Sequence, residues 1–86
     1  MTVHIPSALR SYTAQRSEVE ADGATLTDGL SALDRRYPGI RFRIVDEQDR
    51  IRPHIRVFIN AEQTFQLTTR LQPDDDVYIV CALSGG

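Results

Sequence analysis

The feature of this sequence that most constrains its fold is one apolar stripe at helical spacing, with alternating segments on either side of it. The stripe residues are separated by four, three and four positions, so they share one face of an α-helix. They are Leu26, Leu30, Leu33 and Tyr37. Thr25 is suited to the N-cap, Pro38-Gly39 ends the segment, and Gly29 in its middle predicts a close approach of helix to sheet. The sequence therefore predicts one main helix that packs by this face.

Short segments with a period of two surround the helix and predict strands at 2–5, 18–21, 55–59, 65–67 and 77–82. We expect the first two to form an antiparallel hairpin, and the first and last to be parallel neighbours at the centre of the sheet. Residues 7–15 fit either a loop or a helical turn. Residues 40–53 predict a partly extended connection with an exposed acidic turn, and 60–63 predict a turn. The pattern indicates an α+β fold: a mixed sheet of four to five strands, with the helix across one face.

Composition argues against several functional classes. A net charge of −2 disfavours a nucleic-acid partner, because phosphate binding needs a basic face. No segment approaches the ~18 apolar residues of a membrane span, and the N-terminal residues lack the apolar run of a signal peptide. A single Cys forms no internal disulfide. We therefore expect a soluble cytoplasmic protein with neither a nucleic-acid nor a membrane partner.

No catalytic or metal-binding constellation is recognisable. His4 and His54 are fifty positions apart and lack ligand spacing, so each is interpreted as an ordinary strand residue. Cys81 lies within the last apolar segment, where a thiol is typically an inert packing group. Three consecutive acids, Asp74 to Asp76, are interpreted as a solvated turn, because adjacent carboxylates do not converge on one ion. The chain is not expected to be an enzyme.

The sequence ends in Gly85-Gly86, directly after an apolar segment. One interpretation is a frayed terminus, where small residues are common. The other is chemical. Two residues without side chains fit a narrow tunnel in a partner, and the terminal carboxylate is sterically open to react with a nucleotide phosphate.

Taken with the order of elements, this ending resembles the ubiquitin-like β-grasp sulfur carriers of the MoaD and ThiS type over nearly the whole chain. The stretch from Ile44 to Arg56 resembles the longer carriers, which include those that donate sulfur in amino-acid biosynthesis. The resemblance implies a β-grasp domain over 1–83 and a flexible tail over 84–86. The segments that carry it are Val3-His4-Ile5-Pro6, Tyr37-Pro38-Gly39-Ile40, Val57-Phe58-Ile59-Asn60, Leu71-Gln72-Pro73-Asp74-Asp75-Asp76-Val77 and Leu83-Ser84-Gly85-Gly86.

The resemblance implies a carrier that is a substrate of other enzymes. In this family an adenylyltransferase of the MoeB/ThiF type uses ATP and magnesium to adenylate the C-terminal carboxylate. A sulfur donor then forms a thiocarboxylate, and an accepting biosynthetic enzyme takes the sulfur. Here Gly86 carries the reacting carbon and Gly85 lets it reach the site, while the chain itself binds no cofactor. The sulfur is expected to enter molybdopterin, a thiazole, a sulfur amino acid or a thio-acid metabolite.

The period-two pattern also predicts where partners dock. If the alternate residues of 55–59 and 77–81 face the helix, their neighbours form an apolar patch on the open face of the sheet, near the tail. Exposed patches of this kind often mark protein interfaces. The alternative is that residues 6–15 cover this face. The predicted docking residues are Arg56, Phe58, Tyr78, Val80 and Leu83.

Two other functions remain open: a ubiquitin-like modifier joined through Gly86 to a target lysine, and a β-grasp binding module without C-terminal chemistry. The chain has ten arginines and no lysine. A chain without lysine cannot receive its own C-terminus on a lysine side chain, so lysine-linked polymers are excluded.

Overall fold

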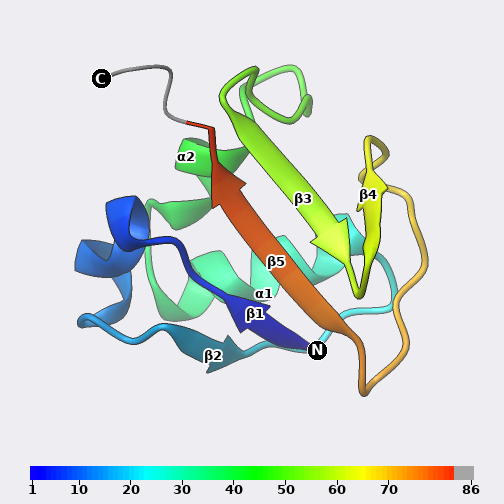
Figure 1. Ribbon diagram of the computed structural model, residues 1–86, viewed down its shortest axis with the longest axis horizontal. Coiled ribbons are helices and arrows are strands. Elements are labelled where there is room, and N and C mark those ends of the chain that lie inside the picture. The colour runs from blue at the N-terminus through cyan, green and yellow to red at the C-terminus, as the bar shows by residue number, and fades with distance from the viewer. Residues whose placement is uncertain (83–86) are drawn as a thin grey trace.

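The computed structural model describes residues 1–82 and contains one five-stranded mixed sheet, in the order β2-β1-β5-β3-β4 (Figure 1). The predicted hairpin is present, because β1 (Thr2–His4) pairs antiparallel with β2 (Glu18–Glu20). The predicted central pair is present too, because β1 runs parallel to β5 (Asp76–Cys81). On its other side β5 pairs antiparallel with β3 (Ile55–Ile59). The last strand along the chain is therefore the middle strand of the sheet.

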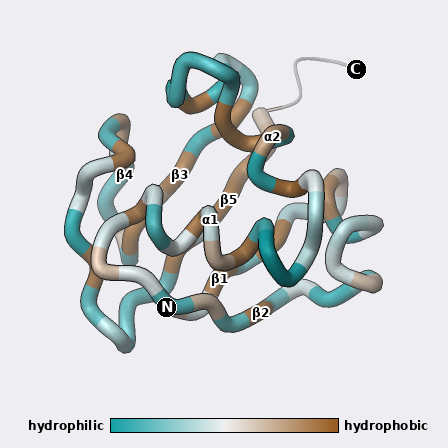
Figure 2. Tube along the Cα trace, turned by 180° about the vertical axis from the view of Figure 1, so that it is seen from behind, coloured by the Kyte–Doolittle hydropathy of each residue, from teal (hydrophilic) through white to brown (hydrophobic). Residues whose placement is uncertain are grey.

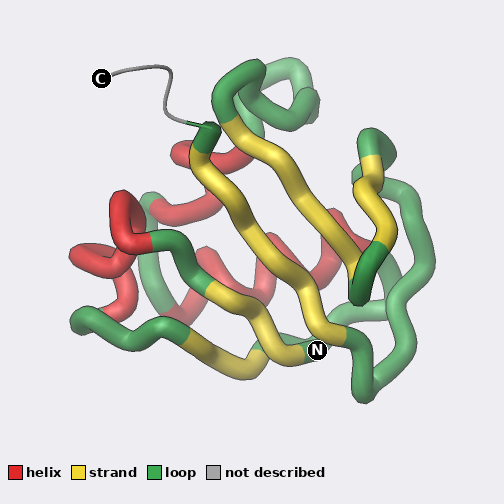
Figure 3. Tube along the Cα trace, viewed as in Figure 1, coloured by secondary structure: helices red, strands yellow, loops and turns green. Residues whose placement is uncertain are grey.

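The main helix, α1 (Leu26–Arg36), lies across one face of the sheet, as the stripe predicts (Figure 3). The Thr25 hydroxyl oxygen accepts a hydrogen bond from the Asp28 backbone N–H at 3.3 Å, which caps the first turn. Leu26, Leu30 and Leu33 have no exposed surface. They pack with the inward residues of the strands in one apolar layer. Figure 2 shows the molecule from the helix side, with hydrophobic segments along β3 and β5 behind α1. The inward strand residues of this layer include Val3, Ile55, Val57, Val77 and Ile79.

The mid-helix glycine marks a point of close packing. An added Cβ at Gly29 would lie 2.4 Å from the Met1 side chain, and one at Gly23 would lie 2.3 Å from the Gly29 backbone nitrogen. The chain before α1 thus approaches the helix so closely that Gly23 has no room for a side chain, whereas a side chain at Gly29 would require the flexible end of Met1 to move.

Residues 40–44 correct the sequence-based expectation of an extended connection. They form a short helix, α2 (Ile40–Ile44), that begins at Gly39 with a φ of 98°. Ile40 and Ile44 are buried, whereas Phe42 is 54% exposed. The two isoleucines are four positions apart, so both lie on the same face of α2 and point into the core. The acidic turn that follows, at 46–49, is largely exposed as expected.

The fourth strand also differs from the expectation. β4 is Glu62–Thr64, not 65–67, and it pairs antiparallel with β3 with Ile59 opposite Glu62. Only Asn60 and Ala61 remain for the turn, and Asn60 adopts a left-handed φ of 56°. Because the turn is this short, the strand begins earlier and Phe65 falls outside it, 74% exposed.

Residues 7–13, which the sequence left undecided, form the 3₁₀ helix η1 (Ser7–Thr13). Leu9 and Thr13 are buried on its inner side. The Thr13 hydroxyl donates to the carbonyl oxygen of Arg16 at 2.9 Å, so its burial leaves no unsatisfied polar group.

Candidate functional site

The predicted apolar patch lies on the open face of the sheet, opposite α1. Tyr78 and Val80 point outward from β5 and are 39% and 42% exposed, whereas Phe58 points outward from β3 and is half-buried. Phe58 is the cross-strand partner of Tyr78, so the three side chains are neighbours. We call Phe58, Tyr78 and Val80 the open-face patch. Since Tyr78 and Val80 remain exposed and η1 packs Leu9 into the core, residues 6–15 do not cover the open-face patch.

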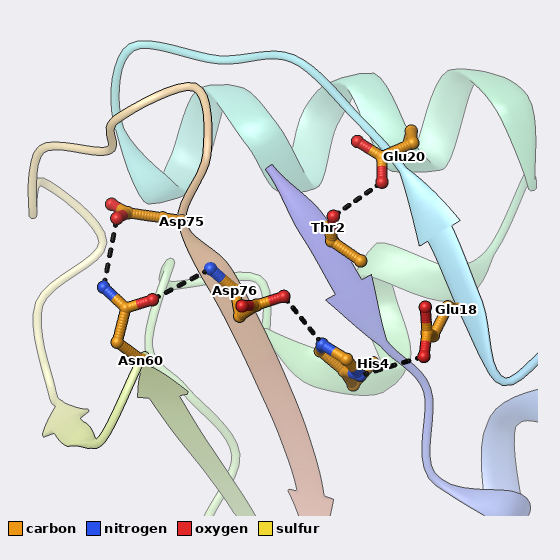
Figure 4. Close-up of polar contacts among 7 residues, drawn as sticks. All are labelled: Thr2, His4, Glu18, Glu20, Asn60, Asp75 and Asp76. Carbon is orange, nitrogen blue, oxygen red and sulfur yellow. Dashed lines mark hydrogen bonds and ion pairs between the residues drawn. The ribbon is translucent and has the colours of Figure 1, made fainter.

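Tyr78 is held in place from the β1 side. The His4 ring stacks on it, with centroids 4.1 Å apart and planes inclined by 9°. His4 is itself held by two carboxylates: its Nε2 lies 3.0 Å from an oxygen of Asp76, and its Nδ1 lies 3.9 Å from one of Glu18 (Figure 4). A fixed aromatic ring loses little freedom on binding, which favours it as an interface anchor.

This histidine cluster was not predicted. His4 was interpreted as an ordinary strand residue, and Asp76 was assigned to a solvated turn. The parallel register, which pairs Thr2 with Asp76 and His4 with Tyr78, brings these side chains together across more than seventy positions of sequence. The only signal in the sequence was that His4 alternates with Val3 and Ile5 and therefore points outward.

The turn before β5 is a second polar cluster. The Asp75 carboxylate accepts a hydrogen bond from the Gln72 backbone N–H at 2.8 Å. It accepts another from the Asn60 side chain at 3.0 Å (Figure 4). These two hydrogen bonds, the one from Gln72 first, hold the pKa of Asp75 below its usual value. Asp75 and Asp76 thus accept hydrogen bonds from protein donors, whereas Asp74 is exposed. Within residues 1–82 no group of three His, Cys, Asp or Glu side chains is placed to hold a metal ion.

Charge divides the open face into two ends. Glu18, Glu20 and Asp76 lie toward β2 and the start of β5. Arg56 lies opposite Val80, toward the end of β5, and donates to the carbonyl oxygen of Pro53 at 2.6 Å. In the described part of the chain no carboxylate pairs with Arg56, so its positive charge remains available beside the open-face patch.

The described part of the chain ends at this positive end. Beyond Cys81 the Ala82 backbone N–H donates to the carbonyl oxygen of His54 at 2.7 Å, which extends the pairing of β5 by one residue. The predicted site residues Leu83, Gly85 and Gly86, and the predicted tail over 84–86, lie outside the described residues. The open-face patch is therefore placed directly before the segment to which chemistry was assigned.

Cys81 is half-buried at the end of β5. Burial raises the pKa of its thiol, so the protonated form is favoured and the thiolate is disfavoured. Its side chain packs against the core cluster. This agrees with the interpretation of Cys81 as a packing residue.

Comparison with known proteins gives a full-length match. The sequence profile of the ThiS family matches residues 3–86. The sulfur carrier protein CysO of Mycobacterium tuberculosis is 33% identical over 91 aligned positions, which cover 100% of this chain and 98% of that protein.

Two solved structures show the same fold. The first is a chain of the Amycolatopsis orientalis BexX/CysO complex, with a TM-score of 0.91, 33% identity and coverage of 99% of this chain and 98% of that chain. The second is SAMP1 from Haloferax volcanii, with a TM-score of 0.77, 26% identity and coverage of 99% and 97%.

The fold and these likenesses define a ubiquitin-like β-grasp protein, and CysO, the relative matched over its whole length, is a sulfur carrier protein rather than an enzyme. The chain belongs to the ThiS family. Both the predicted fold and the predicted family are thereby confirmed. Within the described range, none of the helices combines the length and the apolar character needed to cross a bilayer.

Proposed function

We propose that this protein is a sulfur carrier that bears its sulfur as a thiocarboxylate on Gly86. The observation that carries the proposal is the match of the ThiS family over residues 3–86, which includes the terminal Gly-Gly, together with full-length likeness to CysO carriers. What supports it in the structure is an exposed apolar patch, with Arg56 beside it making no ion pair within residues 1–82, near the end of β5.

The chemistry belongs to the partners. A MoeB/ThiF-like adenylyltransferase positions the Gly86 carboxylate against the α-phosphate of ATP, with magnesium on the phosphates. The carboxylate oxygen forms the new bond to phosphorus and pyrophosphate leaves. A sulfur nucleophile then attacks the acyl carbon and AMP leaves, which yields the thiocarboxylate. This chain contributes an extended tail, because Gly85 and Gly86 have no side chains, and a surface that positions the tail.

The open-face patch is the docking surface in this proposal. Phe58, Tyr78 and Val80 supply the apolar contact and Arg56 flanks it, while Leu83, the fifth predicted docking residue, lies outside the described residues. Since a few desolvated anchors carry most of an interface's energy, the pinned ring of Tyr78 and its neighbour Phe58 are the expected anchors. The sulfur-accepting enzyme uses the same tail. The length of 44–56 and the CysO-like sequence favour the acceptor of CysO-type carriers over those of the shorter ones.

The direct test of adenylation is ATP–pyrophosphate exchange by the cognate adenylyltransferase. The intact chain is expected to support exchange. Deletion of Gly86 is expected to abolish it, because the carboxylate is withdrawn by about 3.5 Å, the reach of one residue. Arg35→Gln, an exposed change on α1, serves as the matched control and leaves exchange unchanged. Exchange that survives the deletion would show that the Gly86 carboxylate is not the reacting group.

A second function is supported by the likeness to SAMP1, which is a small archaeal modifier protein. In that case Gly86 is joined to a lysine of a target protein. Covalent adducts in lysate that require Gly86 would favour this role.

A further inference from the structure

A groove lies at the end of β5, where the described part of the chain stops. It encloses about 300 Å³ between η1, α2 and the end of β5. Figure 1 shows the end of β5 beside α2. Its apolar wall is formed by Leu9, Phe42 and Cys81, and its polar rim by Arg43, Arg52 and His54. We call it the tail-exit groove.

The rim of the tail-exit groove is positively charged. No Asp or Glu lines it. Arg43 is exposed and has no side-chain hydrogen bond or ion pair within residues 1–82. Arg52 donates to the Phe42 carbonyl oxygen at 2.6 Å and makes no ion pair within the same range. Arg52 does act on one acid, since the pKa of Asp46 is lowered first by the hydrogen bond from the Arg50 backbone N–H and also by the charge of Arg52. Arg43 is the rim cation whose charge no ion pair neutralises within residues 1–82.

The wall is also fixed before binding. The guanidinium carbon of Arg52 lies 4.4 Å from the centroid of the Phe42 ring, so cation and ring hold one another. Phe42 remains 54% exposed, at a position of α2 that the core does not require to be apolar. A large apolar side chain framed by arginines matches a partner segment that presents an apolar side chain next to a carboxylate.

The position of the tail-exit groove indicates which partner carries that segment. Cys81 lines the groove, and the next residue, Ala82, bonds to His54 on its rim. An enzyme that encloses the tail from residue 83 onward must contact these same residues. From this charge and this continuity we propose that the tail-exit groove docks an acidic, apolar segment of the enzyme that adenylates Gly86. The inference rests on the proposed function, and it adds a second contact to the one on the open-face patch.

The test is a binding titration with the cognate adenylyltransferase, using charge-matched pairs. Arg43→Glu is expected to raise Kd roughly tenfold or more, because it sets like charges against each other at a partly desolvated contact. Arg35→Glu makes the same change of charge on the exposed side of α1 and is expected to leave Kd within about twofold. A second pair compares the exposed phenylalanines: Phe42→Ala is expected to weaken binding, and Phe65→Ala is not. Circular dichroism checks the fold of all four variants.

Several outcomes would overturn the inference. Equal Kd values for Arg43→Glu and Arg35→Glu would contradict it. Tighter binding of the enzyme by Arg43→Glu and by Phe42→Ala would also contradict it, because that result would show that the groove holds the chain's own residues 83–86. A dimer of the free chain that Arg43→Glu dissociates would assign the groove to a second copy. Exchange measured at saturating enzyme keeps this inference separate from the proposed function. If wild type supports no exchange, the proposed function fails; if it does, and the pairs do not differ, only the groove inference fails.

Discussion

Val3, Val57 and Val77 on the helix side of the sheet have no exposed surface, whereas Tyr78 and Val80, on the other side of the same sheet, are 39% and 42% exposed. The helix side is held by a continuous apolar core, with backbone hydrogen bonds from the start of α1 to residues 67 and 69. The open side is held by cross-strand pairs and by polar contacts such as that of His4 with Asp76. The comparison teaches that one period-two pattern specifies two tasks: burial on one face stabilises the domain, and exposure on the other makes it available to partners.

The largest expected effect is on the helix side. Leu30→Ala is expected to lower the free energy of unfolding by on the order of 2–5 kcal/mol, because Leu30 is fully buried and its loss leaves a cavity. Chemical denaturation measures this. For a domain whose total stability is in the range of about 5–15 kcal/mol, the loss is large. A change of less than about 0.5 kcal/mol would break the assignment of this face to stability.

A smaller effect, of a different kind, is expected on the open side. Val80→Asp is expected to weaken binding to the adenylyltransferase roughly tenfold, because it places a charge in the centre of an apolar contact. The free energy of unfolding should change by less than about 1 kcal/mol, since Val80 is exposed and Arg56 lies across from it. Phe65→Asp, at an exposed site that is not part of the open-face patch, is the control. Equal binding by Val80→Asp and wild type would move the docking surface elsewhere.

The smallest effect concerns the polar end of the open side. Hydrogen bonds to its carboxylate lower the pKa of Asp75 in the folded state from an ordinary value of 3.8. The resulting stability is therefore present above that value and is lost as the pH falls through the folded-state pKa. Asp75→Asn is expected to be slightly less stable than wild type at neutral pH, with the difference shrinking below about pH 4. Urea titrations at several pH values measure it, and Asp74→Asn, which changes an exposed carboxylate without hydrogen-bond partners among residues 1–82, is the control. A difference that grows in acid would contradict the assignment.

The sequence was sufficient for the elements whose period is unambiguous. The stripe of α1 and the alternation in β1, β3 and β5 each admit one way of burying their apolar side chains. The prediction for residues 40–44 was wrong because their apolar side chains fit both the period of two of a strand and the spacing of four of a helix. Only tertiary packing decides between strand and helix here. The predicted position of β4 was wrong because the length of a turn sets where the next strand begins. The residues that form the strand, Glu62 to Thr64, have no apolar pattern that would have marked them.

The candidate site also contains residues whose placement the sequence predicts and residues whose placement it does not. Exposure of Tyr78 and Val80 follows from alternation and was predicted. The stacking of His4 on Tyr78 depends on the parallel register of β1 and β5, which no local pattern reveals. The tail-exit groove depends on α2 and was missed with it. Long-range register and short ambiguous helices are thus the parts that a single sequence left undetermined.

The central claim is that the open side and the tail serve chemistry at Gly86, and intact-mass measurement tests it most directly. The chain is incubated with its cognate adenylyltransferase, ATP, magnesium and a sulfide source. The account predicts that its mass rises by the difference between sulfur and oxygen, that deletion of Gly86 abolishes the rise, and that Gly85→Val reduces it because a branched side chain collides with a narrow channel. If wild type gives neither an adenylate nor a thiocarboxylate with its genuine partner, the carrier function is contradicted and a β-grasp binding module without C-terminal chemistry takes its place.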